Sequence, residues 1–171
     1  MRTEHKLFLI LLFAAILQSI YYYPKMPDMM ASHFGNRGFP NGWSSKNTFF
    51  LIYSGAIAMI GLIFFSLPLS FKLFPDSRIN LPNKDYWLSP ERREETIAFI
   101  NKQMTIFGMA TLVLMIATFE LVFRTNQQKI PHLSSSMWLF LAGYVIFTII
   151  WLVQFIRRFY KKPEHGERRR Q

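Results

Sequence analysis

Residues 137–156 read MWLFLAGYVIFTIIWLVQFI, twenty residues that include no charged side chain. At about 1.5 Å per residue, a helix of this length crosses the hydrocarbon core of a bilayer. Three further apolar runs cover about residues 7–23, 47–74 and 104–123. A soluble domain of 171 residues has no room to bury four such runs. The sequence therefore predicts an all-α integral membrane protein, a bundle of four transmembrane helices.

The composition excludes sites that need cysteine and indicates a membrane rather than a nucleic acid as partner. Cysteine is absent, which excludes disulfides, thiolate metal sites and cysteine nucleophiles. The net charge is +10, and the basic residues cluster beside the apolar runs, as Arg157 and Arg158 do directly after the last one. Such charges orient a membrane protein and attract anionic headgroups. We therefore expect the lipid bilayer as a partner, with anionic lipids at the cytosolic face, and no nucleic acid.

The distribution of lysine and arginine predicts the orientation. Fifteen of the twenty lie in the first segment, in the loop between the second and third runs, and in the tail after the last run. Positive residues concentrate on the cytosolic side of membrane proteins, so both termini are expected inside. The first run is followed by Tyr21-Tyr22-Tyr23 rather than by a small-residue cleavage site, which favours an uncleaved span over a signal peptide.

The expected outer loop, between the first two spans, is dense in turn-forming residues. Proline, glycine and asparagine over residues 24–46 favour an ordered structure of turns. Whether this loop binds a partner is left open by the pattern alone. Our candidates for recognition there are Asp28, His33, Phe34, Gly38, Pro40, Gly42, Trp43 and Lys46.

Catalysis finds little support in the sequence. The four histidines lie in separate terminal or loop segments, and no metalloprotease, hydrolase or phosphate-loop motif is found. We predict no enzymatic activity, no cofactor and no metal. The alternative for a metal is that His33 and His132 meet in the fold near Glu120, since all three are expected on the outer side.

The expected inner loop is the second distinctive stretch. Ser89 is a good N-cap, and Pro90 and Glu91 suit the first turn of a helix. This predicts one long helix from about Pro90 to Phe123 whose first turns are cytosolic. Its charged face is either simply solvated or a docking surface for a cytosolic partner or acidic lipid. The candidates for docking are Tyr86, Trp87, Pro90, Glu91, Arg92 and Arg93.

Glu120 is the one ionisable residue expected inside a span, and such a residue is a candidate for function by default. Arg124 follows four residues later on the same helical face, so an interfacial ion pair is the favoured interpretation. The alternative is a small transporter, or an accessory subunit of a membrane complex, that uses Glu120.

A resemblance to a known family rests on the outer loop. Pro24-x-x-Pro27 is followed by His33-Phe34, Gly38, Pro40, Gly42-Trp43 and Lys46, all between two spans. This order resembles the bacterial membrane family numbered 1648 among the domains of unknown function, over about residues 7–75. It is similar to the N-terminal part of the immunity proteins that protect spore-forming bacteria from the sporulation-delay toxin. The inner string Tyr-Trp-x-x-Pro-Glu-Arg-Arg also recurs in relatives of this family.

The resemblance implies a multi-pass protein of the bacterial cytoplasmic membrane, with this loop on the outer side, and no specific activity. We accordingly divide the chain into a family module at 1–75, a cytosolic loop and helix at 76–103, and the last two spans with a basic tail at 104–171. The expected role is binding at the outer face, in sensing, in toxin immunity or in assembly with a protein or peptide partner.

Overall fold

The computed structural model describes residues 3–73 and 75–160, with the side chains of residues 67–73 left out of the description. Most of the basic tail that the sequence places in the cytosol therefore lies outside the described residues. In chain order the elements are α1 (Thr3–Tyr22), η1 (Tyr23–Lys25), β1 (Met29–Phe34), β2 (Pro40–Ser45), α2 (Lys46–Leu73), η2 (Asp76–Arg78), α3 (Lys84–Trp87), α4 (Arg93–Asn126) and α5 (Ser136–Tyr160).

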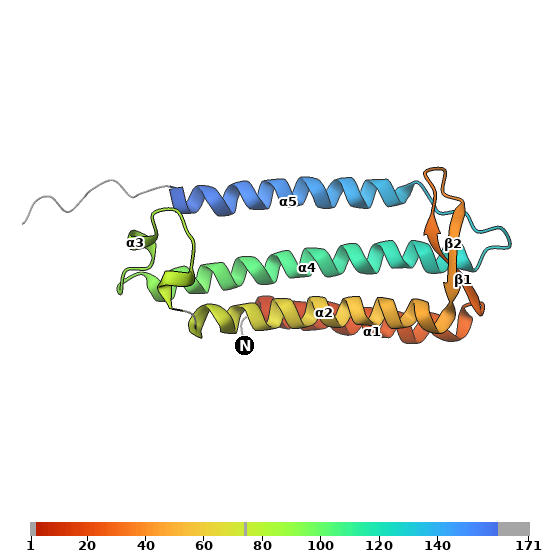
Figure 1. The fold of residues 1–171 in the computed structure, drawn as a ribbon, viewed down its shortest axis with the longest axis horizontal. Coiled ribbons are helices and arrows are strands. Elements are labelled where there is room, and N and C mark those ends of the chain that lie inside the picture. Colours follow the sequence, from red (N-terminus) through yellow and green to blue (C-terminus); the bar gives the residue numbers. More distant parts are fainter. Residues whose placement is uncertain (1–2, 74, 161–171) are drawn as a thin grey trace, which may run out of the picture.

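Four of these elements, α1, α2, α4 and α5, are long and apolar enough to cross a membrane. They lie roughly parallel, with α4 packed against α1 and α2 on one side and against α5 on the other (Figure 1). The predicted fold class, a helical membrane bundle of four spans, is confirmed. The start of α1 and the end of α5 lie at one end of the bundle, which we call the terminal end, and β1 and β2 lie across the other, the hairpin end.

The core of the bundle is aromatic and lies between α1, α2 and α4. Phe123 of α4 is fully buried. Its ring stacks on Tyr22 of α1, with 4.6 Å between centroids, and on Phe50 of α2 at 5.3 Å. Tyr53 stacks on Phe119 at 4.2 Å. Stacked and edge-on ring pairs of this kind add to the stabilisation from buried area alone, so this cluster joins three helices near the hairpin end.

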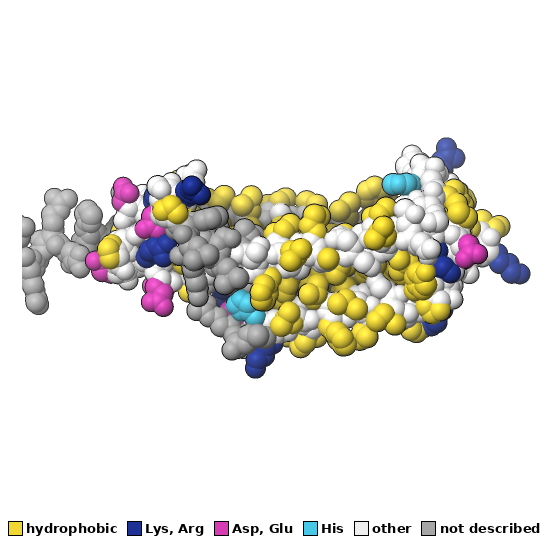
Figure 2. All heavy atoms as spheres, turned by 60° about the horizontal axis from the view of Figure 1, so that its bottom comes forward, with side chains coloured by type: hydrophobic (Ala, Val, Ile, Leu, Met, Phe, Trp, Pro, Cys, Tyr) yellow, Lys and Arg dark blue, Asp and Glu magenta, His cyan; other side chains and the backbone are white. Residues whose placement is uncertain are grey.

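The outward faces of the helices are apolar. In Figure 2, hydrophobic side chains cover much of the middle of the bundle, and charged side chains gather toward its two ends. Helix α5 is the extreme case, because no residue in its most apolar stretch of 18 residues is buried, and Leu139 is 73% exposed. This distribution is the one that a hydrocarbon environment requires.

The long helix that contains the third span, α4, begins at Arg93, three residues after the predicted start at about Pro90. Arg92 is its first flanking residue, with no side-chain cap. The expectation that the Ser89 side chain caps this helix is wrong. It is the Ser89 carbonyl that accepts the N–H groups of Arg92 and Arg93, at 3.0 and 2.9 Å, in a turn that precedes the helix.

The length of α4 agrees with a helix that extends beyond the bilayer. Its 34 residues span about 51 Å at about 1.5 Å per residue, against a hydrocarbon core of about 30 Å. The first turns of α4 pack with the loop before them, where Ile97 and Ile100 are buried together with Ile79, Leu88 and Phe159. A second small core thus closes the terminal end.

Candidate functional site

The loop expected to consist of turns is a β-hairpin. β1 and β2 pair antiparallel, from Met29 opposite Ser45 to Phe34 opposite Pro40. The connection is a tight turn in which the N–H of Gly38 donates to the Gly35 carbonyl at 2.9 Å, and the N–H of Gly35 donates to the Phe39 carbonyl at 2.8 Å. Gly38 has a φ of +80°, a conformation that glycine adopts readily. The turn occurs where glycine and asparagine predict one, but the two strands that it joins were not predicted.

Several of the proposed recognition residues build this hairpin. Gly42 lies opposite His33, and a Cβ at Gly42 would come within 3.0 Å of the His33 side chain. Lys46 closes the base, since its backbone N–H donates to the Asp28 carbonyl at 2.8 Å and its ammonium lies 3.5 Å from the Asp28 carboxylate. Gly38, Gly42 and Lys46 therefore have structural roles that account for their positions.

The hairpin is held to the bundle by one side chain that the sequence reading did not single out. Asn126, at the end of α4, accepts the Ala31 N–H at 2.7 Å and donates to the Ala31 carbonyl at 3.1 Å. The amide thereby bonds both main-chain groups of a β1 residue, as a neighbouring strand would. Ala31 and Asn126 are both buried, so the attachment is shielded from water.

The turn of the hairpin is held by the connection between α4 and α5. The N–H of Leu133 donates to the Gly38 carbonyl at 2.8 Å. The Phe39 ring packs edge-on against the His132 imidazole, with 4.9 Å between centroids. With Asn126, these contacts fix the hairpin at its middle and at its tip.

What the hairpin leaves open is one edge and one set of side chains. Main-chain groups of an antiparallel strand alternately face the partner strand and face away from it. The N–H and carbonyl of Ala31 face away from β2 and bond Asn126. Trp43 lies opposite Ala31, so the N–H and carbonyl of Trp43 face away from β1. No described residue pairs with that edge of β2. The side chains of Met29, His33 and Trp43 are also exposed.

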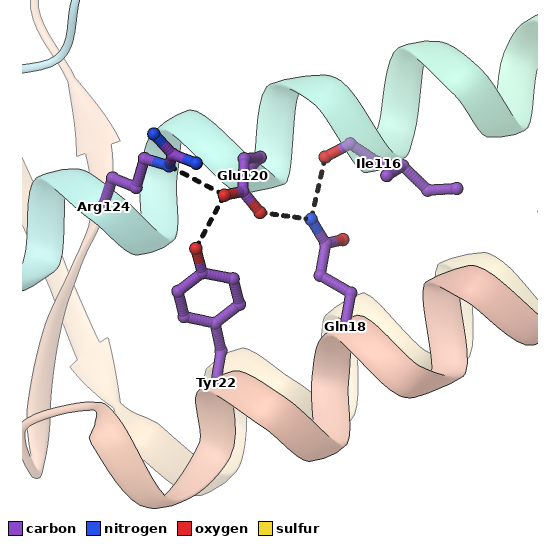
Figure 3. Close-up of polar contacts among 5 residues, drawn as sticks. All are labelled: Gln18, Tyr22, Ile116, Glu120 and Arg124. Carbon is purple, nitrogen blue, oxygen red and sulfur yellow. Dashed lines mark hydrogen bonds and ion pairs between the residues drawn. The ribbon is translucent and has the colours of Figure 1, made fainter.

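Below the hairpin, Glu120 forms a polar cluster between α4 and α1 (Figure 3). One carboxylate oxygen accepts the Tyr22 hydroxyl and the Arg124 Nε–H, both at 2.7 Å. The other accepts the Gln18 amide at 2.9 Å. The expected ion pair of Glu120 with Arg124 is confirmed. Both carboxylate oxygens are thus satisfied by protein groups, as a charge near a bilayer requires.

The cluster continues to the second helix through Gln18. Its amide N–H₂ also donates to the Ile116 carbonyl at 3.0 Å, and its amide oxygen accepts the Tyr53 hydroxyl at 2.7 Å. Hydrogen bonds from Gln18 therefore connect α1 to α2 and α4. Neither Gln18 nor the two tyrosines were singled out as site residues from the sequence, since tyrosine near a membrane boundary usually indicates only an interfacial anchor.

The predicted docking residues at the terminal end separate into two groups. Trp87 is structural, because its indole N–H donates at 3.0 Å to the Phe159 carbonyl near the end of α5. Arg93 pairs with Asp76 at 2.8 Å, and Tyr86 lies under the Arg92 guanidinium at 4.1 Å.

Pro90 and Glu91 remain exposed at that end. The pKa of the Glu91 carboxyl is lowered, chiefly by a hydrogen bond from its own backbone N–H, which favours the charged form. This carboxylate is therefore a solvated negative charge at the start of the helix.

The metal alternative is not supported within residues 3–73 and 75–160. No group of three or more potential ligands gathers there. His33 lies over Gly42, and His132 packs on Phe39. Glu120 is bonded within its own cluster. The three residues share the hairpin end but do not converge.

Comparison with known proteins adds one assignment. No curated protein and no solved structure matches the chain. The model of a family described as "Domain of unknown function (DUF1648)" matches residues 9–57. That segment contains most of α1, the whole β-hairpin and the start of α2 as far as residue 57. Residues 9–57 are therefore similar to this family, and the hairpin lies inside the matched segment.

Proposed function

We propose that this protein is a non-enzymatic membrane protein that binds a protein or peptide partner at the outer face, and that the β-hairpin, Met29–Ser45, carries the recognition. The open edge of β2 supports this proposal most directly. Unpaired main-chain groups on an edge strand are a template for a further strand. The Trp43 main chain faces that edge, and its side chain, 52% exposed, lies on the same strand.

The rigidity of the hairpin also favours binding. A two-stranded hairpin alone is marginally stable in water, yet this one is bonded to α4 through Asn126 and to the α4–α5 connection through Gly38. A surface that is already ordered loses little conformational entropy when a partner arrives. The attachment blocks the β1 edge at Ala31 and leaves the β2 edge for the partner.

The partner chemistry follows from this edge. An extended segment pairs with the main chain of Trp43 by two hydrogen bonds and packs an apolar side chain on the indole. Residues 40–45 carry no charge, so specificity comes from neighbouring groups such as Asp28 and Arg37. A short toxin-like peptide satisfies these requirements, which is the basis for an immunity-like role.

The position of the protein is part of the proposal. The hairpin end faces outward from a bacterial cytoplasmic membrane, and the terminal end faces the cytosol. This orientation is supported by the concentration of fifteen of the twenty basic residues on the segments that lead to the terminal end.

A photoreactive amino acid at position 43, in the full-length protein in native membranes, tests the binding. A discrete protein or peptide adduct is expected at position 43, weakened when Asn126 is also replaced by Leu. Position 149, an exposed residue in the middle of α5, is the matched control and gives only lipid adducts. If position 43 yields only lipid adducts, the proposed binding is wrong.

A second candidate function rests on Glu120. A carboxylate among Tyr22, Gln18 and Arg124 within the helical bundle is also the arrangement of a transporter or of an accessory subunit. Replacing Glu120 with Gln abolishes a transport phenotype but leaves partner binding largely intact. Replacing His33 or Trp43 with Ala does the reverse, so the two functions separate in the same assays.

A further inference from the structure

A cleft between α4 and α5 opens at the terminal end of the bundle. It is an open cleft with a volume of about 820 Å³, lined by Phe99 and Gln103 of α4 and by Gln154, Phe155, Arg157, Arg158 and Tyr160 of α5. The rings of Phe99 and Phe155 are nearly parallel, at 14° with 6.1 Å between centroids. Aromatic walls and polar rims therefore meet in one place, far from the hairpin.

Only some of the polar side chains of the cleft have a bonding partner among the described residues. Arg158 is engaged, because its guanidinium bonds the Glu95 carboxylate at 3.0 Å and lies 4.0 Å from the centre of the Phe99 ring. Within the described part of the chain, Arg157 has no ion pair, and Gln103 and Gln154 have no side-chain hydrogen bond. Among the described residues, one positive charge without an ion pair and two amides without side-chain hydrogen bonds thus line the same opening.

The depth of the cleft indicates the environment of its ligand. Gln154 lies six residues before the end of α5 at Tyr160, which is about 9 Å along the axis at about 1.5 Å per residue. The uncharged run of α5 ends at Ile156, and Arg157 follows directly. The cleft therefore lies where hydrocarbon gives way to headgroups.

We propose that the α4–α5 cleft binds one anionic phospholipid, whose phosphate is bonded by Arg157, Gln103 and Gln154 and whose glycerol and first methylenes pack on Phe99 and Phe155. Guanidinium and amide donors match phosphate oxygens in geometry, and the guanidinium supplies the charge. The volume exceeds what a phosphate alone requires, and the apolar walls suit the part of a lipid beside its headgroup. Arg158, bonded to Glu95, holds one wall in place.

The test uses purified full-length protein in micelles of a zwitterionic detergent. The protein is titrated either with phosphatidylglycerol or with phosphatidylcholine of the same acyl chains. Thermal unfolding and native mass spectrometry report binding. Phosphatidylglycerol is expected to raise the midpoint of unfolding and phosphatidylcholine to do so much less. Arg157→Gln weakens phosphatidylglycerol binding about tenfold, the effect of one charge-assisted hydrogen bond. Arg157→Lys keeps the charge and retains most of the preference.

The matched control is Arg37→Gln, which removes one exposed positive charge at the hairpin end and leaves lipid binding unchanged. The unfolding midpoint of each variant without lipid shows whether it is folded. Equal binding of the two lipids, or unchanged phosphatidylglycerol binding by Arg157→Gln, overturns the proposal. So does equal protection by inorganic phosphate at the same concentration, because the ligand is then a free anion rather than a lipid.

Discussion

Asn126 shows how much one side chain contributes at the residue scale. Its amide bonds both main-chain groups of Ala31, at 2.7 and 3.1 Å, and its N–H₂ also donates to the Val122 carbonyl of the helix that carries it, at 3.0 Å. These bonds fix the distance between the helix end and β1. A polar side chain at the end of a span looks in the sequence like an ordinary boundary residue, so this role could not be predicted without the hairpin.

Replacing Asn126 with Leu should destabilise the protein markedly. The change leaves the buried N–H and carbonyl of Ala31 unpaired, and each such group costs about 1–3 kcal/mol. The free energy of unfolding in detergent measures the loss. Asn47→Leu is the control, because Asn47 bonds the Tyr23 hydroxyl at an exposed site, and its loss should stay within about 0.5 kcal/mol. Equal stability of the two variants would show that the attachment is unimportant.

Gly38 and Gly35 form a matched pair at the turn. Gly38 has a φ of +80°, and a Cβ there would lie 2.6 Å from the Leu133 carbonyl oxygen, a backbone atom that cannot easily move. A Cβ at Gly35 would meet its nearest neighbour at 3.7 Å. Gly38→Ala should therefore lower the unfolding midpoint by several degrees, with a cost of about 1–3 kcal/mol, whereas Gly35→Ala should be close to neutral. Protease sensitivity of the hairpin is an independent readout.

At the scale of elements, close contact between helices depends on where glycine lies. A Cβ at Gly108 of α4 would come within 2.6 Å of the Phe64 ring of α2, whereas one at Gly55 of α2 would meet nothing within 4 Å. The second span also contains Gly55 and Gly61, which are compatible with close helix packing but do not form a GxxxG pair. Gly61 does approach Leu12 of α1, at 3.4 Å, but Gly55 faces open space.

This contrast gives a prediction for two alanine variants. Gly108→Ala should overpack the α2–α4 contact and cost about 1–3 kcal/mol. Gly55→Ala should be neutral or stabilising by up to about 1 kcal/mol, because alanine favours the helix. Unfolding in a denaturant series reports both. A stabilising Gly108→Ala would mean that Phe64 moves aside at little cost.

The sequence predicts helices well and the hairpin poorly, for a physical reason. A span is specified by its own composition, so about twenty uncharged residues suffice to find α5. Strands β1 and β2 have six residues each, contain Pro40 and Gly42, and show two register irregularities. They are held by Asn126 and Leu133, each 95 residues further along the chain than the residue that it bonds. No local pattern contains that information.

At the scale of the whole molecule, the candidate site is partly readable from the sequence. The outer loop was identified as the distinctive segment, and the Glu120–Arg124 pair was expected from its spacing of four. Tyr22 and Gln18 bond Glu120, and Tyr53 bonds Gln18, only because three helices meet at one level. The order of the spans around the bundle decides this, and spacing along the chain does not specify it.

The absence of cysteine makes the orientation directly measurable. Asn36 at the hairpin turn and Asp85 at the terminal end are both exposed. With Asn36→Cys as the only thiol, a membrane-impermeant maleimide should label intact cells. With Asp85→Cys, labelling should require permeabilised cells. The reverse pattern would place the termini outside and contradict the charge distribution.

The position of α5 also has a consequence for biogenesis. α5 makes its helix contact with α4, whereas α1, α2 and α4 pack on one another. A ribosome delivers spans in chain order, so the three helices that share the aromatic core leave the ribosome before α5 does. Asn126, which bonds Ala31, also leaves before α5. The last helix is thus the one that the aromatic core does not need, and its arrival completes the connection that bonds the hairpin turn.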